Sequence, residues 1–173
     1  MIGHTPPPGA LPVSVLGAGN SFIVAAVVLD RVYLKSARAL TPARILMIPA
    51  EAVRRYFGED AAFARALATE LALAYRNVVK ELKNQKLRSS LERLANWLLA
   101  CDNETGGHGR FQLPFEKRTL AARLGMAPEV LSRSFAALAP YKVIVKGSEI
   151  QIRDPEALKQ LAKPTPTIDD PLI

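Results

Sequence analysis

The sequence predicts an α+β fold made of a small β-rich unit, one long helix and a C-terminal helix-turn-helix followed by a β-hairpin. Three observations support this order. Short apolar segments separated by glycine and proline come first, an apolar stripe with helical spacing follows, and two short amphipathic helices joined at a glycine come near the end. The 173 residues are enough for one or two small domains with a hydrophobic core.

The first part of the chain is predicted to be rich in β-structure. Residues 1–10 are rich in proline and are expected to be a disordered leader. Three segments have the apolar composition of strands, and residues 17–20 have that of a turn. The predicted strands are residues 11–16, 33–40 and 43–48. Together with a short helix at residues 49–57, they define a predicted domain over residues 11–57.

A long helix is predicted over residues 58–84. Its apolar stripe steps by three, four, three and four residues, which is the spacing of a coiled-coil seam. The stripe consists of Ala64, Leu67, Leu71, Ala74 and Val78. We interpret it as the interface of a homodimer, and packing of the same stripe within its own domain is the alternative. The basic stretch Lys80–Arg88 is expected to contain the hinge to the next domain.

Residues 113–138 carry the most informative pattern, which is two short amphipathic helices hinged at Gly125. Glycine readily adopts the positive φ that ends a helix, and Pro128 suits the first turn of the next helix. One shared core is predicted from Leu120, Leu124, Val130, Leu131, Phe135 and Leu138. Charged side chains remain for the outer faces. The pattern favours a helix-turn-helix, and a helical hairpin in a bundle is the alternative.

The segments after this motif favour a winged helix. Residues 141–146 and 149–153 alternate like strands around a Gly-Ser turn, which predicts a β-hairpin. A winged helix-turn-helix domain is therefore predicted over residues 85–162. Residues 163–173 are rich in proline and threonine and are expected to be a disordered tail.

Composition limits the function. The net charge of +7 and the pI near 9.8 favour a polyanionic partner. Cys101 is the only cysteine, so an intramolecular disulfide and an iron–sulfur cluster are not expected, and a cytoplasmic location is favoured. The sequence has no apolar run long enough to span a bilayer, and we expect no membrane partner. Because it also lacks a catalytic cluster of histidine, cysteine and carboxylate residues, we do not expect an enzyme.

These residues resemble the CRP/FNR family of transcription regulators. The resemblance covers about Val13–Ala162 and is most specific in Leu91–Leu99, Leu120–Met126 and Glu129–Arg133. It implies a β-roll sensor domain of the cyclic-nucleotide-binding type, a dimerisation helix and a DNA-binding winged helix. It also implies double-stranded DNA and RNA polymerase as partners of a homodimer.

The resemblance assigns DNA contacts residue by residue. The Glu-x-x-Ser-Arg pattern that reads bases in FNR-like members stands here as Glu129, Ser132 and Arg133. An arginine can donate two hydrogen bonds to guanine, a carboxylate can accept one from cytosine, and a serine hydroxyl can do either. A surface salt bridge between Glu129 and Arg133 is the plainer interpretation, and the two are compatible. The resemblance also implies contacts with DNA phosphates, at positions that correspond here to Lys117, Arg118 and Lys146.

The sensor region departs from the family. Ile23 and Val24 stand where cyclic-nucleotide binders carry Gly-Glu, and Lys35 replaces their phosphate-binding arginine, so cyclic nucleotide is not the expected effector. The sequence most resembles the NnrR-type branch, which controls nitrite and nitric oxide reduction in denitrifying bacteria. This resemblance implies nitric oxide as the signal and haem as a cofactor. His4 lies in the leader and His108 in a glycine-rich loop, and neither position favours axial ligation of haem.

The resemblance also implies that the chain begins partway through the β-roll. A roll without its first strands would have open edges and an uncovered apolar face on Phe22–Leu29. Two functions follow. The favoured one is a sequence-specific regulator of nitrogen-oxide or anaerobic respiration genes. The alternative is a sensor-defective dimerisation partner or interaction protein that modulates a full-length homologue.

Overall fold

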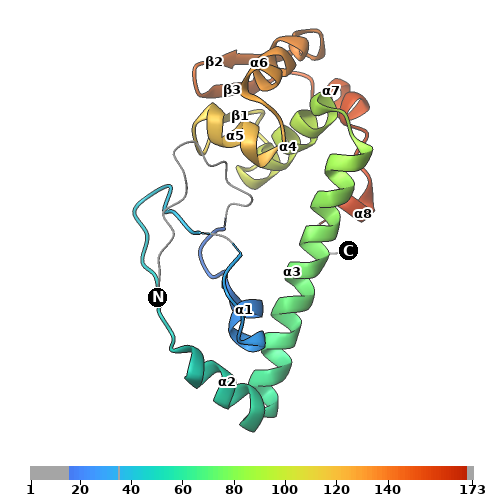
Figure 1. Cartoon of the computed structure of the whole chain (residues 1–173). Helices are drawn as coiled ribbons and strands as arrows, with labels where there is room; N and C mark the ends of the chain where they lie inside the picture. Colours follow the sequence, from blue (N-terminus) through green and yellow to red (C-terminus); the bar gives the residue numbers. More distant parts are fainter. Residues whose placement is uncertain (1–15, 35, 171–173) are drawn as a thin grey trace. The chain divides into compact units, whose positions relative to one another are not determined.

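A computed structural model describes residues 16–34 and 36–170 of the chain (Figure 1). The described residues divide into two units, which are residues 16–78 and 79–170. The predicted leader and residues 11–15 of the first predicted strand lie outside the described residues. In the ranges that the structure describes, helices long and apolar enough to cross a membrane are absent.

The first unit is helical. Helices α1 (Val24–Leu29) and α2 (Ala50–Glu59) pack together, and α3 (Ala61–Leu87) begins in this unit. The contact between α1 and α2 includes Arg54, which donates a hydrogen bond to the Val27 carbonyl and forms a 2.9 Å ion pair with Asp30. The apolar run that we expected on the face of a β-roll therefore forms a short helix.

The strands predicted at residues 33–40 and 43–48 are wrong, because the described residues there have no regular secondary structure. A strand is held by backbone hydrogen bonds to a neighbouring strand, and among the described residues of this unit none supplies that neighbour. The apolar side chains consequently face solvent, with Leu34 96% exposed and Leu46 84% exposed. By contrast, the turn predicted at residues 17–20 is confirmed, since the Asn20 amide donates to the Gly17 carbonyl.

Asp60 marks the break between α2 and α3. Its Oδ1 accepts hydrogen bonds from the backbone N–H groups of Ala62 and Phe63, at 2.8 and 3.0 Å. These are two of the amides that lack a partner at the start of a helix, so Asp60 acts as the N-cap of α3. Gly58, where the sequence predicts the interruption, lies inside α2.

The second unit contains the sheet, and this confirms the α+β class. After the end of α3, this unit contains, in chain order, α4 (Ser90–Glu104), β1 (Arg110–Gln112), α5 (Lys117–Arg123), α6 (Pro128–Ala137), the 3₁₀ turn η1 (Ala139–Tyr141), β2 (Val143–Lys146), β3 (Glu149–Ile152), α7 (Pro155–Ala162) and α8 (Pro166–Asp169). The strands are antiparallel in the order β1-β3-β2. The predicted hairpin is thus β2–β3, and Gly147 in its turn has a φ of 63°.

The hydrophobic core lies within the second unit. Phe111 of β1 and Val145 of β2 both lie opposite Ile150 of β3, which is fully buried. Helices α4, α5, α6 and α7 contribute leucines that are also fully buried or nearly so. The core predicted for the helix pair is confirmed, since Leu120, Leu124, Leu131, Phe135 and Leu138 are buried and Val130 packs against them.

The first turn of α4 is fixed by Ser89. The Ser89 hydroxyl accepts a hydrogen bond from the Glu92 backbone N–H, and the Glu92 carboxylate accepts from the Ser89 backbone N–H. This reciprocal arrangement is a capping box. The hydrogen bonds from the Ser89 backbone and side chain lower the pKa of Glu92 below its ordinary value.

Most of the predicted disordered tail is ordered. Residues 163–170 include helix α8, and they are held against the end of α3 by an ion pair between Arg88 and Asp169. The composition of this segment suggested disorder, but specific side chains of α3 and α4 bind it. Residues 171–173 lie outside the described residues.

Candidate nucleic-acid interface

The turn between α5 and α6 has the geometry that the sequence predicts. Gly125 has a φ of 62°, which an L side chain rarely adopts. Its N–H donates to the Ala122 carbonyl, and the Met126 N–H donates to the Ala121 carbonyl, at 3.0 and 2.9 Å. This is the hydrogen-bond pattern of a Schellman motif, and it ends α5. Pro128 occupies the first turn of α6, as expected.

A buried arginine ties this turn to the end of α3. The Arg93 guanidinium donates through Nε to the Leu124 carbonyl at 2.9 Å and through Nη1 to the Arg88 carbonyl at 2.8 Å. Longer bonds of 3.5 and 3.4 Å reach the carbonyls of Gln85 and Gly125. Carbonyls at a helix C-terminus lack partners and carry partial negative charge, so one cation satisfies the ends of both α3 and α5.

The role of Arg93 was not predicted from the sequence. Its neighbours Leu94 and Ala95 are completely buried, but nothing in the spacing of the sequence distinguishes Arg93 from a solvated arginine. The signal that could have found it is its position directly beside fully buried residues. A guanidinium placed there must satisfy its donors, and helix C-termini are the nearest acceptors.

Helix α6 presents its predicted base-reading residues on one exposed face. Glu129, Ser132 and Arg133 are exposed, whereas Leu131 and Phe135 on the opposite face are buried. The spacing of three and four residues places the three side chains side by side. Among the ion pairs of the described residues, none joins Glu129 to Arg133, so the plainer salt-bridge interpretation is not supported.

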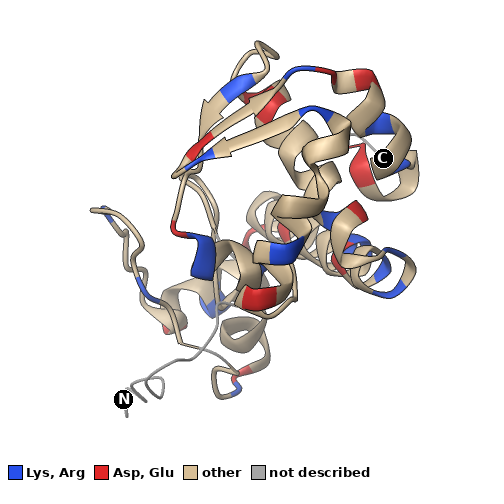
Figure 2. Ribbon diagram, turned by 90° about the horizontal axis from the view of Figure 1, so that it is seen from above, with Lys and Arg blue, Asp and Glu red and all other residues tan. Residues whose placement is uncertain are grey.

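The predicted phosphate contacts lie on other elements. Lys117 and Arg118 occupy the first turn of α5, and Lys146 ends β2 beside the turn of the β2–β3 hairpin. All three are exposed. The Lys117 ammonium lies 5.4 Å from the centre of the Phe135 ring, a cation–π distance that links α5 to α6. Basic and acidic residues alternate over the ribbon, so charge alone outlines no single interface (Figure 2).

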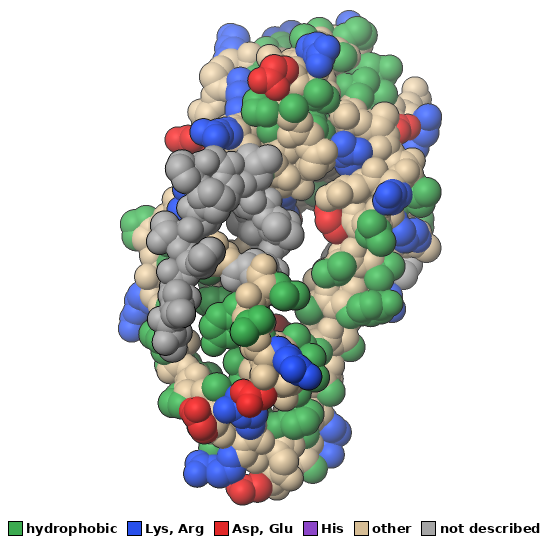
Figure 3. Space-filling view, in the orientation of Figure 1, with side chains coloured by type: hydrophobic (Ala, Val, Ile, Leu, Met, Phe, Trp, Pro, Cys, Tyr) green, Lys and Arg blue, Asp and Glu red, His purple; other side chains and the backbone are tan. Residues whose placement is uncertain are grey.

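The residues predicted at a dimer interface all lie on α3. Ala64, Leu67 and Leu71 are half-buried in the single chain, whereas Ala74 and Val78 are exposed. Val78 exposes 66% of its surface, and Tyr75 exposes 70%. Hydrophobic side chains of this kind are visible on the surface in Figure 3. In the described part of α3 no residue is buried.

The second unit also contains a small cavity and a buried thiol. A cavity of about 130 Å³ beside Cys101 is lined by Trp97, Phe115 and Arg123 among others. Burial and the nearby Glu104 raise the pKa of the Cys101 thiol to about 12, so the thiol is protonated at neutral pH. A group of three or more histidine, cysteine and acidic side chains that could hold a metal ion is absent from the described residues.

Comparisons with known proteins agree with this geometry. Residues 92–161 match the family model described as the Crp-like helix-turn-helix domain. No curated protein matches the chain. Solved structures share its fold. FixK2 from Bradyrhizobium japonicum is 23% identical with a TM-score of 0.56, and the match covers 68% of this chain and 61% of that one.

Two further structures match. A protein from Eubacterium rectale assigned as a transcriptional regulator of the crp/fnr family is 23% identical with a TM-score of 0.60, and the match covers 68% of this chain and 54% of that one. A protein from Ruegeria pomeroyi named for cyclic nucleotide binding is 28% identical with a TM-score of 0.54, covering 82% and 62%. The chain therefore spans between about half and two thirds of the lengths of these structures.

Proposed function

We propose that the chain is a sequence-specific DNA-binding transcription regulator of the CRP/FNR type. The observation that carries this proposal is the face of α6, where Glu129, Ser132 and Arg133 stand exposed and without ion pairs among the described residues, on a Crp-like helix-turn-helix domain. A carboxylate, a hydroxyl and a guanidinium side by side match the donors and acceptors of base edges in a major groove. A salt bridge between them would have occupied two of the three groups.

The basic side chains on α5 and the wing supply the remaining part of the proposed interface. Lys117, Arg118 and Lys146 would neutralise phosphates, which contributes affinity and salt dependence but no sequence information. In the proposed dimer, residues 85–162 bind DNA and residues 58–84 form the contact between the two chains.

The direct test is selection of bound duplexes from a random pool by the purified chain. We expect enrichment of an inverted repeat whose half-sites lie about one helical turn apart, because a two-fold dimer presents two α6 helices to one face of DNA. Recovery of sequences no more related than the starting pool would contradict the proposal.

Dimerisation through α3 is part of the proposal. The support is the seam spacing of its apolar residues together with the exposure of Val78 and Tyr75 in the single chain. We expect sedimentation to show a dimer, and replacement of Leu71 by aspartate to shift it towards monomer, because the seam would then bury a charge. Arg76→Asp, an exposed position off the predicted seam, is the matched control. Equal dimer content in both variants would contradict the assignment of the seam.

The genes and the signal follow from resemblance to the NnrR-type branch. We propose that the selected sites lie upstream of nitrogen-oxide or anaerobic respiration genes and that nitric oxide is the signal. Haem is the cofactor that this resemblance implies, and the absorption spectrum of the purified protein is the test. If the protein shows no Soret band after haem addition and removal of the unbound haem, haem is removed from the proposal.

One observation favours the second candidate, a sensor-defective partner of a full-length homologue. Among the described residues of the first unit none is buried, and Leu34 and Leu46 are almost fully exposed. Such surface needs a cover. Mixing the chain with a differently tagged full-length relative and isolating mixed dimers tests this candidate. Exclusive formation of homodimers would contradict it.

A further inference from the structure

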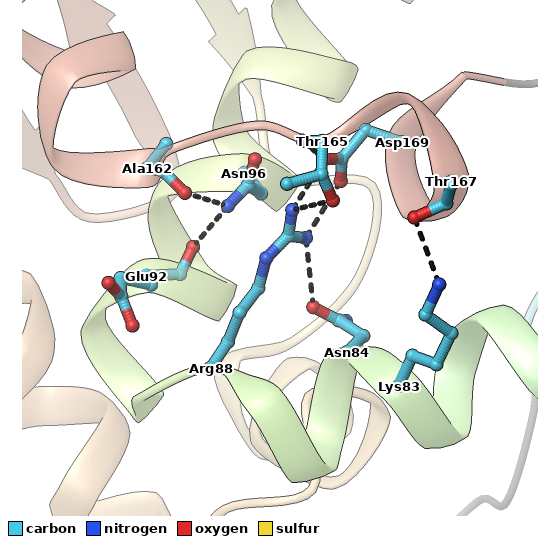
Figure 4. A network of polar contacts seen from close by, with 9 residues as sticks. All are labelled: Lys83, Asn84, Arg88, Glu92, Asn96, Ala162, Thr165, Thr167 and Asp169. Carbon is cyan, nitrogen blue, oxygen red and sulfur yellow. Dashed lines mark hydrogen bonds and ion pairs between the residues drawn. The ribbon is translucent and has the colours of Figure 1, made fainter.

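The C-terminal segment, residues 163–170, crosses the junction between α3 and α4 and is bound on both sides of it (Figure 4). On the α3 side the main contact is Arg88, which follows the last residue of the helix. Its Nη1 donates to Asp169 Oδ1 at 2.8 Å and its Nη2 to Asp169 Oδ2 at 2.5 Å. This two-point geometry is the strong form of an arginine–carboxylate pair.

The pair is shielded from solvent, unlike an ordinary surface ion pair. The Arg88 side chain is only 6% exposed and the Asp169 side chain 28%. Both partners are also held by other groups. The guanidinium donates to Asn84 Oδ1 at 3.1 Å, and Asp169 Oδ2 accepts from the Thr165 backbone N–H at 2.6 Å. These additional hydrogen bonds already hold both side chains in place. Forming the ion pair between Arg88 and Asp169 therefore costs less conformational entropy than an ordinary surface pair does.

Two lysines extend the contact along one face of α3. Lys83 Nζ donates to Thr167 Oγ1 at 2.9 Å, and Lys80 Nζ donates to the Asp170 carbonyl at 2.5 Å. Residues 80, 83 and 84 lie on the same side of a helix as residue 88. The basic stretch at the end of α3 is therefore a docking face for the tail.

The start of the segment is bound to α4. Lys163 forms a 3.2 Å ion pair with Glu92, and Asn96 Nδ2 donates at 2.6 Å to the carbonyl of Ala162, the last residue of α7 and the residue directly before the segment. Only Arg88 and Ser89 separate α3 from α4. A segment attached to both helices restricts rotation about this short connection.

The junction is also linked to the helix-turn-helix. Arg93 bonds the Arg88 carbonyl on one side and the Leu124 carbonyl on the other, so the end of α3 and the end of α5 share one guanidinium. A change of angle at the junction would therefore reach the turn that precedes α6.

We propose that Arg88 and Asp169 are positioning residues for operator binding: their ion pair clamps the α3–α4 junction so that both α6 helices of a dimer meet their half-sites at once. This inference rests on the proposed function. It assigns to the C-terminal segment the control of half-site spacing, with no DNA contact of its own.

The test compares a duplex containing two half-sites with one containing a single half-site. Asp169→Asn keeps the shape of the side chain and removes its charge. We expect about tenfold weaker binding to the two-site duplex, because the gain from a second site depends on geometry. Binding to the single-site duplex should stay within about twofold of wild type. The charge swap Arg88→Asp with Asp169→Arg should recover part of the loss, and Glu156→Gln, which breaks only the exposed pair with Lys159, should change neither.

Equal weakening on both duplexes would overturn the inference, because a merely structural role would affect all binding alike. Hydrogen exchange without DNA gives an independent reading. In Asp169→Asn the amides at the end of α3 and in residues 163–170 should exchange faster together, and unchanged exchange would also overturn the clamp. A wild-type chain that binds neither duplex would overturn the proposed function instead, and the exchange result then decides on the clamp alone.

Discussion

The two units of this chain differ in how far their apolar side chains are buried. In the second unit, Leu94, Leu98, Leu120 and Ile150 are completely buried. In the first unit none of the described residues is buried, and Leu34 is 96% exposed. The comparison teaches that apolar content alone does not make a core, because the elements that carry it must also find partners.

The difference lies in whether the extended segments find a neighbouring strand for their backbone hydrogen bonds. In the second unit β1 and β2 both pair with β3, and one face of this sheet is covered by helices. In the first unit the extended segment before α2 has no pairing strand among the described residues. An unpaired strand cannot hold its side chains on one face, so they remain in water.

The largest expected effect is the loss of stability from a core truncation in the second unit. Leu98→Ala should reduce the free energy of unfolding by about 2–5 kcal/mol, because it leaves a cavity among fully buried neighbours. Leu46→Ala in the first unit should change it by no more than about 0.5 kcal/mol, since that side chain is already exposed. Urea unfolding followed by the fluorescence of Trp97, the only tryptophan, reports on the second unit. Similar losses in the two variants would break the comparison.

A smaller effect is expected from the cap of α4. Ser89→Ala removes the hydroxyl that accepts from the Glu92 backbone N–H and should cost about 1 kcal/mol in the same experiment. Ser21→Ala is the matched control, because the Ser21 hydroxyl donates only to the exposed Glu70 carboxylate in the first unit. A greater loss for Ser21→Ala than for Ser89→Ala would contradict the assignment of stability to the second unit.

At neutral pH the smallest effect is expected from the protonation of Cys101, because this contribution to stability changes only in alkaline solution. The pKa of the Cys101 thiol is raised from 9.0 to about 12, chiefly by burial. The unfolded chain therefore loses this proton at lower pH than the folded chain does. The contribution of the buried thiol is complete below the ordinary thiol pKa and falls as pH rises from about 9 towards 12. Unfolding measured against pH should show a shallower alkaline decline for Cys101→Ala than for wild type. Parallel profiles would contradict the shift.

The helix-turn-helix could be predicted from the sequence because its signals are local. Gly125 fixes the turn, Pro128 marks the next helix, and residues such as Leu131 and Phe135 repeat at helical spacing. Each signal involves residues that are neighbours along the chain, so no distant partner had to be known. The alternation that predicts the β-hairpin is local in the same sense, and the paired strands β2 and β3 confirm the hairpin.

The features that were missed depend on distant partners. The strands predicted at residues 33–40 and 43–48 have suitable composition but no pairing partner among the described residues. The tail was expected to be disordered, yet it is held by Arg88, which lies 81 residues away from Asp169. Arg93 likewise reaches the Leu124 carbonyl across 31 residues. Propensity and periodicity carry no information about such contacts.

In the proposed function, the exposed face of α6 reads the DNA sequence. The most direct measurement is the affinity of Arg133→Ala and Lys117→Ala for a selected duplex and for random duplex. Arg133→Ala should lose about 1–3 kcal/mol of discrimination at one base pair, whereas Lys117→Ala should weaken binding to both duplexes alike. Equal losses on the two duplexes for Arg133→Ala would contradict the proposed function.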